Sequence, residues 1–200
     1  MKITATSDIH GARAPKIPVY GGEVLIIAGD LTNNGSVNEI ARFIFEWDPY
    51  CSAFDKVFII PGNHDTCLTQ PEVVKMITQN IPNAMVFFGG TYTYEGVKFG
   101  FMPWSPIYGP FEFMANEKFI ANKLEKVGKV DVLVTHSPPF YTLDSVHSGE
   151  HVGSTSIANF VDTVPPKFHV FGHIHEDSGI VTTTLTTFIN TACRITEFEV

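Results

Sequence analysis

Four short, mainly apolar runs set the pattern of this 200-residue chain, and a polar residue follows each of them within three positions. Runs this short are typical of β-strands that are covered on both faces, as in a parallel sheet with flanking helices. Segments with helical spacing separate several of the runs, so the sequence predicts an α/β fold. The runs are Val24–Ala28, Val57–Ile60, Val130–Thr135 and Phe168–Phe171.

Helix signals fall between these predicted strands. Ser36 and Glu39 form a capping-box pattern, and the helix that follows should end by Asp48, because Pro49 disfavours a helical residue before it. Residues 12–22, which are rich in proline and glycine, are predicted to form a loop. The other predicted elements are helices over 71–79, within 112–127 and over 154–161, strands over 3–7, within 86–102 and over 180–185, 187–190 and 194–200, and a long loop over 140–152.

The residues at the predicted strand ends share an unusual chemistry. They offer carboxylate, imidazole and carboxamide groups, and no cysteine thiolate. Because ligand sites in α/β sheets collect at the carboxyl ends of strands, we expect these groups to converge. The mixture suits a catalytic site for manganese, iron or zinc better than a structural zinc site. The residues are Asp8, His10, Asp30, Asn63, His64, Asp65, His136, His173 and His175.

The set holds more candidate ligands than one ion needs. Asp30 can bridge two ions, and two ions about 3.5–4 Å apart are a known device for phosphoryl chemistry. Such a pair lowers the pKa of a shared water toward ~7, so that a bridging hydroxide can act as the nucleophile. His64 is then better used as a general acid that protonates the leaving oxygen, and its neighbour Asp65 can hold its tautomer.

The order of these blocks resembles the calcineurin-like metallophosphoesterase superfamily, from the first strand to about residue 175. The resemblance implies a single domain over residues 1–200, built as two mixed β-sheets that form a sandwich flanked by helices. It also implies that His64, with Asp65 beside it, contacts the phosphate or the leaving group. The implied ligands are Asp8, His10 and His175 for one metal, Asn63, His136 and His173 for the second, and Asp30 as the bridge.

A closer resemblance is to the small metallophosphoesterase-domain (MPPED-type) phosphodiesterases, which hydrolyse phosphodiesters including cyclic nucleotides. It is carried by residues 102–106, 135–139, 169–176 and 188–192. Mammalian members of that subgroup have glycine where this chain has His173, so a complete second metal site is expected here. The resemblance therefore implies a phosphodiesterase for nucleotides or cyclic nucleotides. Two divalent ions are the expected cofactors, with manganese favoured over iron, zinc, nickel, cobalt or magnesium.

The sequence allows two alternatives to the phosphodiesterase function. A phosphomonoesterase or protein phosphatase would use the same ions on the same scaffold. A non-enzymatic scaffold module is the second alternative, although such modules typically lose metal ligands and this chain lacks none of them.

Three further residues are candidates for substrate contact. Asn33 follows the bridging aspartate in the same loop, and Arg13 follows the first pair of ligands. Trp104 begins a loop rich in aromatic residues, whose other members we assign to core or lid packing. Those members are Tyr108, Phe111 and Phe113.

Composition narrows the partners and the compartment. The net charge of −8 argues against strong non-specific binding to nucleic acid, so a small phosphodiester or nucleotide is the expected partner. No apolar stretch is long enough to span a bilayer, and the first residues do not resemble a signal peptide. The three cysteines show no metal-binding spacing. We therefore expect a cytoplasmic protein with reduced thiols.

Overall fold

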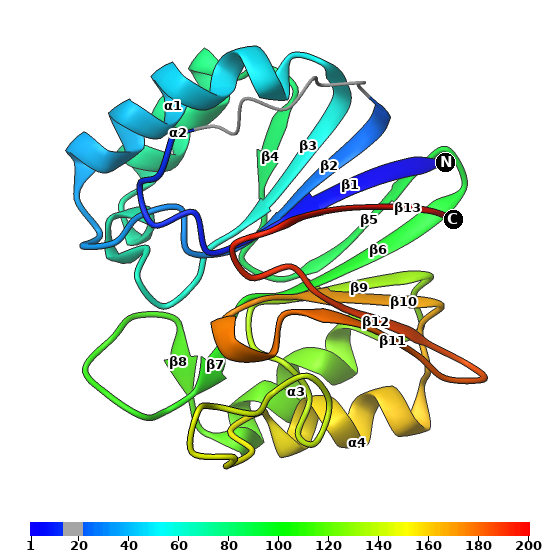
Figure 1. The fold of residues 1–200 in the computed structure, drawn as a ribbon. Helices are drawn as coiled ribbons and strands as arrows, with labels where there is room; N and C mark the ends of the chain where they lie inside the picture. Colours follow the sequence, from blue (N-terminus) through cyan, green and yellow to red (C-terminus); the bar gives the residue numbers. More distant parts are fainter. Residues whose placement is uncertain (14–21) are drawn as a thin grey trace.

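The computed structural model describes residues 1–13 and 22–200, and two large β-sheets pack face to face in it (Figure 1). Helices cover the outer face of each sheet, so the predicted α/β sandwich of two mixed sheets is confirmed. Most of the loop predicted over residues 12–22 lies outside the described residues. None of the helices in the described part of the chain has the length and apolar character that a bilayer-spanning segment needs.

The first sheet contains five strands in the order β13-β1-β2-β3-β4, and α1 and α2 cover it. Its elements are β1 (Lys2–Thr6), β2 (Gly22–Ala28), α1 (Val37–Cys51), β3 (Phe54–Ile60), α2 (Pro71–Asn80), β4 (Ala84–Val86) and β13 (Ile195–Glu199). Strands β1, β2, β3 and β4 run parallel, and β13 pairs antiparallel with β1. The carboxyl ends of β1, β2 and β3 therefore lie at one edge of this sheet.

The second sheet has six strands in the order β11-β12-β10-β9-β6-β5, and α3 and α4 cover it. Its elements are β5 (Gly90–Tyr94), β6 (Val97–Met102), α3 (Glu117–Val127), β9 (Val132–Thr135), α4 (Thr155–Thr163), β10 (Phe168–Phe171), β11 (Gly179–Thr182) and β12 (Thr187–Asn190). The four central strands run parallel. A separate two-stranded pair joins β7 (Ser105–Pro106) to β8 (Met114–Ala115).

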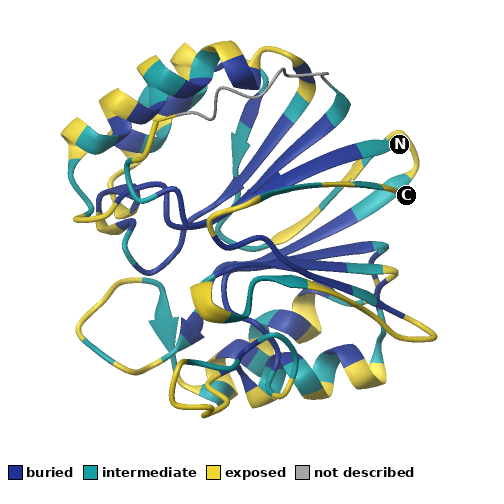
Figure 2. Ribbon diagram, in the orientation of Figure 1, coloured by how far each residue is buried: buried dark blue, intermediate teal, exposed yellow. Residues whose placement is uncertain are grey.

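Strand β2 shows why the apolar runs of the sequence are continuous. Leu25 and Ile27 pack toward the helices, whereas Val24 and Ile26 join the core between the two sheets. From Val24 to Ala28 both faces of the strand are buried (Figure 2), so this stretch leaves no position for a polar side chain. Each such side chain contributes about 1.5–3 kcal/mol of hydrophobic stabilisation.

Helix α1 begins as predicted and ends later than predicted. Ser36 caps it, and both contacts of the capping box with Glu39 are present. The prediction that it ends by Asp48 is wrong, because it continues through Pro49 to Cys51. Pro49 has no N–H to donate to the carbonyl of Phe45, four residues before it, and Phe45 is exposed, so this carbonyl can be hydrated. The last turn is also favoured because Cys51 is fully buried in the core.

Candidate metal centre

Five loops meet at one edge of the fold, and they carry the residues that the sequence predicts for the site. The loops follow β1, β2, β3, β9 and β10, at the carboxyl ends of these strands (Figure 1). Among the described residues, three overlapping groups place imidazole nitrogens and carboxylate oxygens within 4.8 Å of one another. The groups are Asp8 with His10 and His175, His10 with Asp30 and His64, and Asp30 with His136 and His173.

The outer group, defined as Asp8, His10 and His175, lies beside solvent. Asp8 Oδ1 is 3.1 Å from His175 Nε2, and the Nε2 atoms of His10 and His175 are 3.3 Å apart. The Asp8 side chain is fully buried, whereas 44% of the His175 side chain is exposed. Ser7 Oγ and the backbone N–H of His173 donate to the Asp8 carboxylate from the interior. The carboxylate is thus fixed while the imidazoles meet it from the solvent side.

The inner group, defined as Asn63, His136 and His173, is more deeply placed. His136 is fully buried, Asn63 is 1% exposed, and 3.0 Å separates His136 Nε2 from Asn63 Oδ1. The ring centroid of His173 is 5.0 Å from that of His136. These side chains come from the loops after β3, β9 and β10, so strands of both sheets are needed to assemble the group.

Asp30 lies between the two groups. Its Oδ2 atom is 3.8 Å from His10 Nε2 in the outer group and 3.4 Å from His136 Nε2 in the inner group. Its Oδ1 atom accepts the backbone N–H of His64 at 2.9 Å. The carboxylate therefore has one oxygen anchored and the other facing imidazoles of both groups, which is the arrangement that a bridging ligand requires.

Backbone carbonyls at the end of β2 and in the loop after it fix the tautomers of three imidazoles. A carbonyl oxygen can only accept a hydrogen bond, so the Nδ1 atom of each ring must carry the proton. The neutral rings then offer the lone pair of Nε2. The contacts are His136 Nδ1 to Ala28 O at 2.8 Å, His10 Nδ1 to Thr32 O at 3.3 Å, and His64 Nδ1 to Asn33 O at 2.7 Å.

The inner group has more acceptor atoms than protons. Nε2 of neutral His136 faces Asn63 Oδ1 and Asp30 Oδ2, and none of the three atoms carries a proton. Burial opposes a charged ring, yet the carboxylates of Asp30 and Asp8 raise the pKa of His136 to about 9. A buried cluster that attracts a proton this strongly also attracts a metal cation, and its nitrogen and oxygen donors suit a divalent ion. The residues therefore fit the predicted metal.

The other imidazoles differ in how readily they can bind a cation. Burial lowers the pKa of His10, and burial together with the His136 charge lowers the pKa of His173 to about 3. The hydrogen bond with Asp8 instead raises the pKa of His175. Metal binding needs an unprotonated nitrogen, so His175 is the one of these three rings that must give up a proton it holds more tightly than usual.

The backbone is strained where it presents these side chains. Asp8, His10, Asp30 and His173 all have left-handed φ angles, of 56°, 47°, 56° and 70°. Each such residue costs on the order of 1 kcal/mol and persists only where its surroundings hold it. Gly62 is needed for another reason, because a β-carbon there would collide with the Asp30 carboxylate. Asp and His are enriched at left-handed φ angles among the residues other than glycine, so the residue types of the site also suit the backbone that presents them.

The structure corrects the predicted relation between His64 and Asp65. The sequence interpretation has Asp65 holding the tautomer of His64, and this is wrong. Asp65 is fully buried, and its carboxylate accepts the backbone N–H groups of Thr32 and Gly62, each at 2.9 Å. It ties the loop after β2 to the loop after β3, while the Asn33 carbonyl orients the imidazole.

Two predicted substrate contacts lie near the site in different ways. Asn33 is exposed, and its backbone carbonyl accepts a hydrogen bond from the His64 ring. The Asn33 residue is therefore in direct contact with that ring. The Arg13 side chain is 79% exposed, and its Nε lies 3.9 Å from Glu46 of α1. The substrate role of both residues stays a prediction.

The aromatic loop between β7 and β8 brings two aromatic residues to the site, and neither is the predicted Trp104. Trp104 packs against Phe119 of α3 and the ammonium group of Lys123. The ring centroid of Phe111 instead lies 5.0 Å from that of His64, and Tyr108 lies 5.4 Å from His173. The sequence assigns both rings to packing. Their aromatic character was a usable signal, but only the fold shows which rings reach the histidines.

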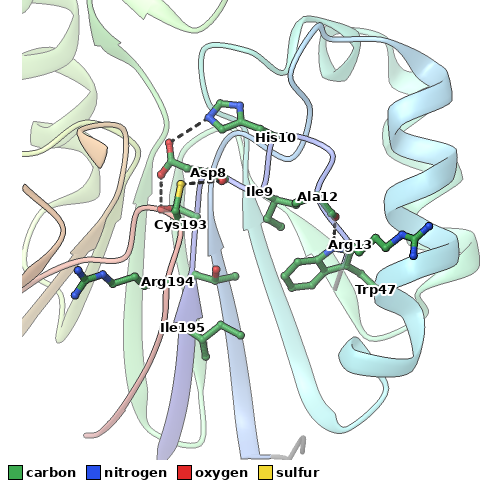
Figure 3. A pocket seen from close by; sticks show the side chains of 11 residues that line it. Asp8, Ile9, His10, Ala12, Arg13, Trp47, Cys193, Arg194 and Ile195 are labelled. Atoms are coloured by element: carbon green, nitrogen blue, oxygen red, sulfur yellow. Dashed lines mark hydrogen bonds and ion pairs between the residues drawn. The ribbon is translucent and has the colours of Figure 1, made fainter. Parts of the chain in front are cut away.

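A cavity of about 440 Å³ borders the outer group. Asp8 and His10 lie at its edge with the Cys193 thiol, and Trp47 supplies part of its apolar lining (Figure 3). Arg13 also lines it, but its guanidinium extends away from Asp8 (Figure 3). The lining of this cavity includes Asp8 and His10 of the outer group and no residue of the inner group.

Comparisons with known proteins give the chain a family. A model of the calcineurin-like phosphoesterase family matches residues 1–177. The human metallophosphoesterase domain-containing protein 1 is 30% identical over 187 residues, which cover 80% of this chain and 56% of the human protein. The chain thus spans little more than half the length of that relative. The predicted resemblance to the superfamily and to the metallophosphoesterase-domain proteins is confirmed.

Solved structures share the fold at low sequence identity. Protein TT1561 of Thermus thermophilus has a TM-score of 0.65 and 13% identity, over 96% of this chain and 88% of that one. A protein described as a novel archaeal phosphodiesterase has a TM-score of 0.51 and 13% identity, over 96% of this chain and 84% of its own. At this level of identity they establish the architecture alone.

Proposed function

The chain belongs to the calcineurin-like phosphoesterase family, and we propose that it is a phosphodiesterase for nucleotides or cyclic nucleotides. The family is one of metal-dependent phosphoesterases with a dinuclear divalent centre. One observation carries the proposal: two groups of nitrogen and oxygen donors share Asp30 between them. We assign the outer group to one ion and the inner group to the other.

Two divalent ions, when bound, would activate a water and neutralise charge on the phosphoryl group. The chain's own contribution is to fix the donors before any ion arrives. The carbonyls of Ala28 and Thr32 hold two rings in the tautomer that offers Nε2, and Asp65 ties the two loops that carry Asp30 and Asn63. Such positioning lowers the cost of reorganisation during the reaction.

We assign His64 to proton transfer. Its Nδ1 proton is used in the hydrogen bond to the Asn33 carbonyl, so the ring acts as an acid in its imidazolium form, in which Nε2 carries a second proton and passes it to the leaving oxygen. In hydrolysis the bond from phosphorus to the leaving oxygen breaks, that oxygen takes the proton, and a water oxygen becomes bonded to phosphorus. The proximity of His64 to Asp30 and His10 also permits metal ligation, which metal analysis of a variant can separate from the acid role.

The preference for diesters comes from the resemblance of the sequence to the small phosphodiesterases, and it agrees with the archaeal protein of the same fold that is described as a phosphodiesterase. The resemblance of the sequence to phosphodiesterases of cyclic nucleotides supports the nucleotide class. Manganese is our proposed ion, because the donor set combines carboxylate, carboxamide and imidazole groups.

Hydrolysis assays with added Mn²⁺ test this proposal. The protein should cleave bis(p-nitrophenyl) phosphate and members of a panel of 2′,3′- and 3′,5′-cyclic nucleotides, and it should cleave p-nitrophenyl phosphate less efficiently. A higher rate on monoesters would assign the protein to the phosphomonoesterases instead. Folded, metal-loaded protein that leaves every diester and monoester intact would contradict any phosphoesterase function.

A further inference from the structure

The aromatic loop, residues 107–113 between β7 and β8, places two exposed rings beside the site. Tyr108 is 58% exposed and Phe111 is 40% exposed. Their centroids are 5.6 Å apart, and each ring also lies next to a candidate site histidine, His173 for Tyr108 and His64 for Phe111. The pair therefore forms a continuous aromatic wall along the inner group and the proposed acid.

The loop that carries this wall is tethered at its base. The backbone N–H of Ser105 donates to the Phe113 carbonyl at 2.9 Å, and the Phe113 ring lies 5.9 Å from that of Phe88. Gly109 lies under the wall, because a β-carbon there would be 3.0 Å from the ring of Phe111. The rings thus hold a defined place although the loop crosses the surface.

The exposure of the two rings is not explained by packing alone. Aromatic side chains contribute most to stability when they are buried, yet these two leave about half of their surface in water. Trp104, at the start of the same segment, packs against α3 instead. Exposed, tethered aromatic faces at a site are typical of stacking platforms for planar ligands.

We propose that Tyr108 and Phe111 form a specificity wall that binds an aromatic leaving group of the phosphodiester, such as the base of a leaving nucleoside. The inference rests on the proposed function, because the position of the leaving group is deduced from the assignment of His64 as the acid. The acid must lie beside the leaving oxygen, and Phe111 is in ring contact with that acid. A planar group attached to the leaving oxygen would therefore meet the wall.

A pair of substrates that differ only in the leaving group tests the wall. One is methyl phenyl phosphate, and the other is a methyl fluoroalkyl phosphate whose fluoroalcohol matches phenol in acidity. Wild-type protein with Mn²⁺ should show a kcat/KM about tenfold higher for the phenyl ester, since stacking on an aromatic ring contributes that much to binding. Phe111→Ala and Tyr108→Ala should each bring this ratio toward one.

Ile107→Ala is the matched control, because Ile107 lies on the same loop and is 65% exposed. It should keep the wild-type ratio. Circular dichroism melts of all three variants should match the wild type, so that a changed ratio reports on recognition and not on folding. An unchanged ratio in both aromatic variants, or an equal change in the Ile107 variant, would overturn the wall.

Binding measurements distinguish failure of the wall from failure of the proposed function. Phenylphosphonate and methylphosphonate carry carbon–phosphorus bonds that hydrolysis does not cleave, and calorimetry gives their Kd values. The wall predicts about tenfold tighter binding of phenylphosphonate, lost in Phe111→Ala and kept in Ile107→Ala. If wild type hydrolyses neither these esters nor bis(p-nitrophenyl) phosphate and the cyclic nucleotides, the proposed function fails, and the Kd values then test only whether the wall binds an aromatic group. Equal Kd values for the two phosphonates in wild type would overturn it.

Discussion

The outer and inner groups use the same kinds of donor atom but lie in different surroundings. His136 of the inner group is fully buried, whereas nearly half of the His175 side chain in the outer group is exposed next to a cavity. Burial makes an unpaired donor set expensive, so positive charge, either a proton on His136 or a bound metal ion, should stabilise the inner group more than the outer group. The outer group can exchange its ion with solvent at less cost. The two proposed ions should therefore differ in how tightly they are held.

Asp30 is the link between the groups, and its removal should have the largest effect. Asp30→Ala should lose both ions and lower kcat/KM on bis(p-nitrophenyl) phosphate by at least about 10³-fold. Metal content by mass spectrometry and steady-state kinetics measure the two effects. Asp162→Ala, an exposed carboxylate on α4, is the control and should change neither. A normal metal load in Asp30→Ala would remove this residue from the bridge.

His64 lies beside His10 of the outer group and the Asp30 carboxylate, and its variant tests whether it is an acid or a ligand. His64→Ala should keep the wild-type metal content and lose about 10²–10⁴-fold in kcat on diesters with poor leaving groups. The loss should be smaller with p-nitrophenol, which leaves without a proton. Loss of one ion in this variant would make His64 a ligand, and full activity on poor leaving groups would exclude the acid role.

Paired variants of the two groups test the effect of burial directly. In metal-free protein, His136→Ala should lower the free energy of unfolding by about 2–4 kcal/mol, because it leaves the Asp30 carboxylate and the Asn63 amide buried without their partner. His175→Ala should lower it by under about 1 kcal/mol, because that ring is half exposed. Urea denaturation measures both values. Equal losses would show that burial does not distinguish the groups.

His169 gives a smaller test, because it is as buried as His136 but lacks a carboxylate partner. Burial lowers the pKa of His169 to about 3, the opposite of the shift at His136. The unfolded chain therefore takes up the proton first, so stability from this residue is complete above pH 6.5 and is lost as the pH falls below it. Between about pH 6.5 and about pH 5 the loss of unfolding free energy should be about 2 kcal/mol smaller in His169→Leu. Urea titrations of metal-free protein check this, and parallel profiles for the two proteins would contradict it.

The strand ends could be predicted from sequence because burial on both faces leaves a clear apolar pattern that stops where the loops begin. The same pattern places Asp30 and His136 just after two of these strands, β2 and β9. The role of Asp65 could not be predicted. Its position next to His64 in the sequence suggested a contact between the two side chains, but the turn directs the Asp65 carboxylate to the backbone N–H groups of Thr32 and Gly62. The exposed rings of Tyr108 and Phe111 also escaped prediction, because aromatic character alone does not tell packing from recognition.

The most direct test of this account is an anomalous-diffraction map from crystals soaked in Mn²⁺. The account predicts two peaks in one site, one bounded by Asp8, His10 and His175 and the other by Asn63, His136 and His173, with the Asp30 carboxylate touching both. A single peak, or peaks in separate places that do not share Asp30, would contradict it.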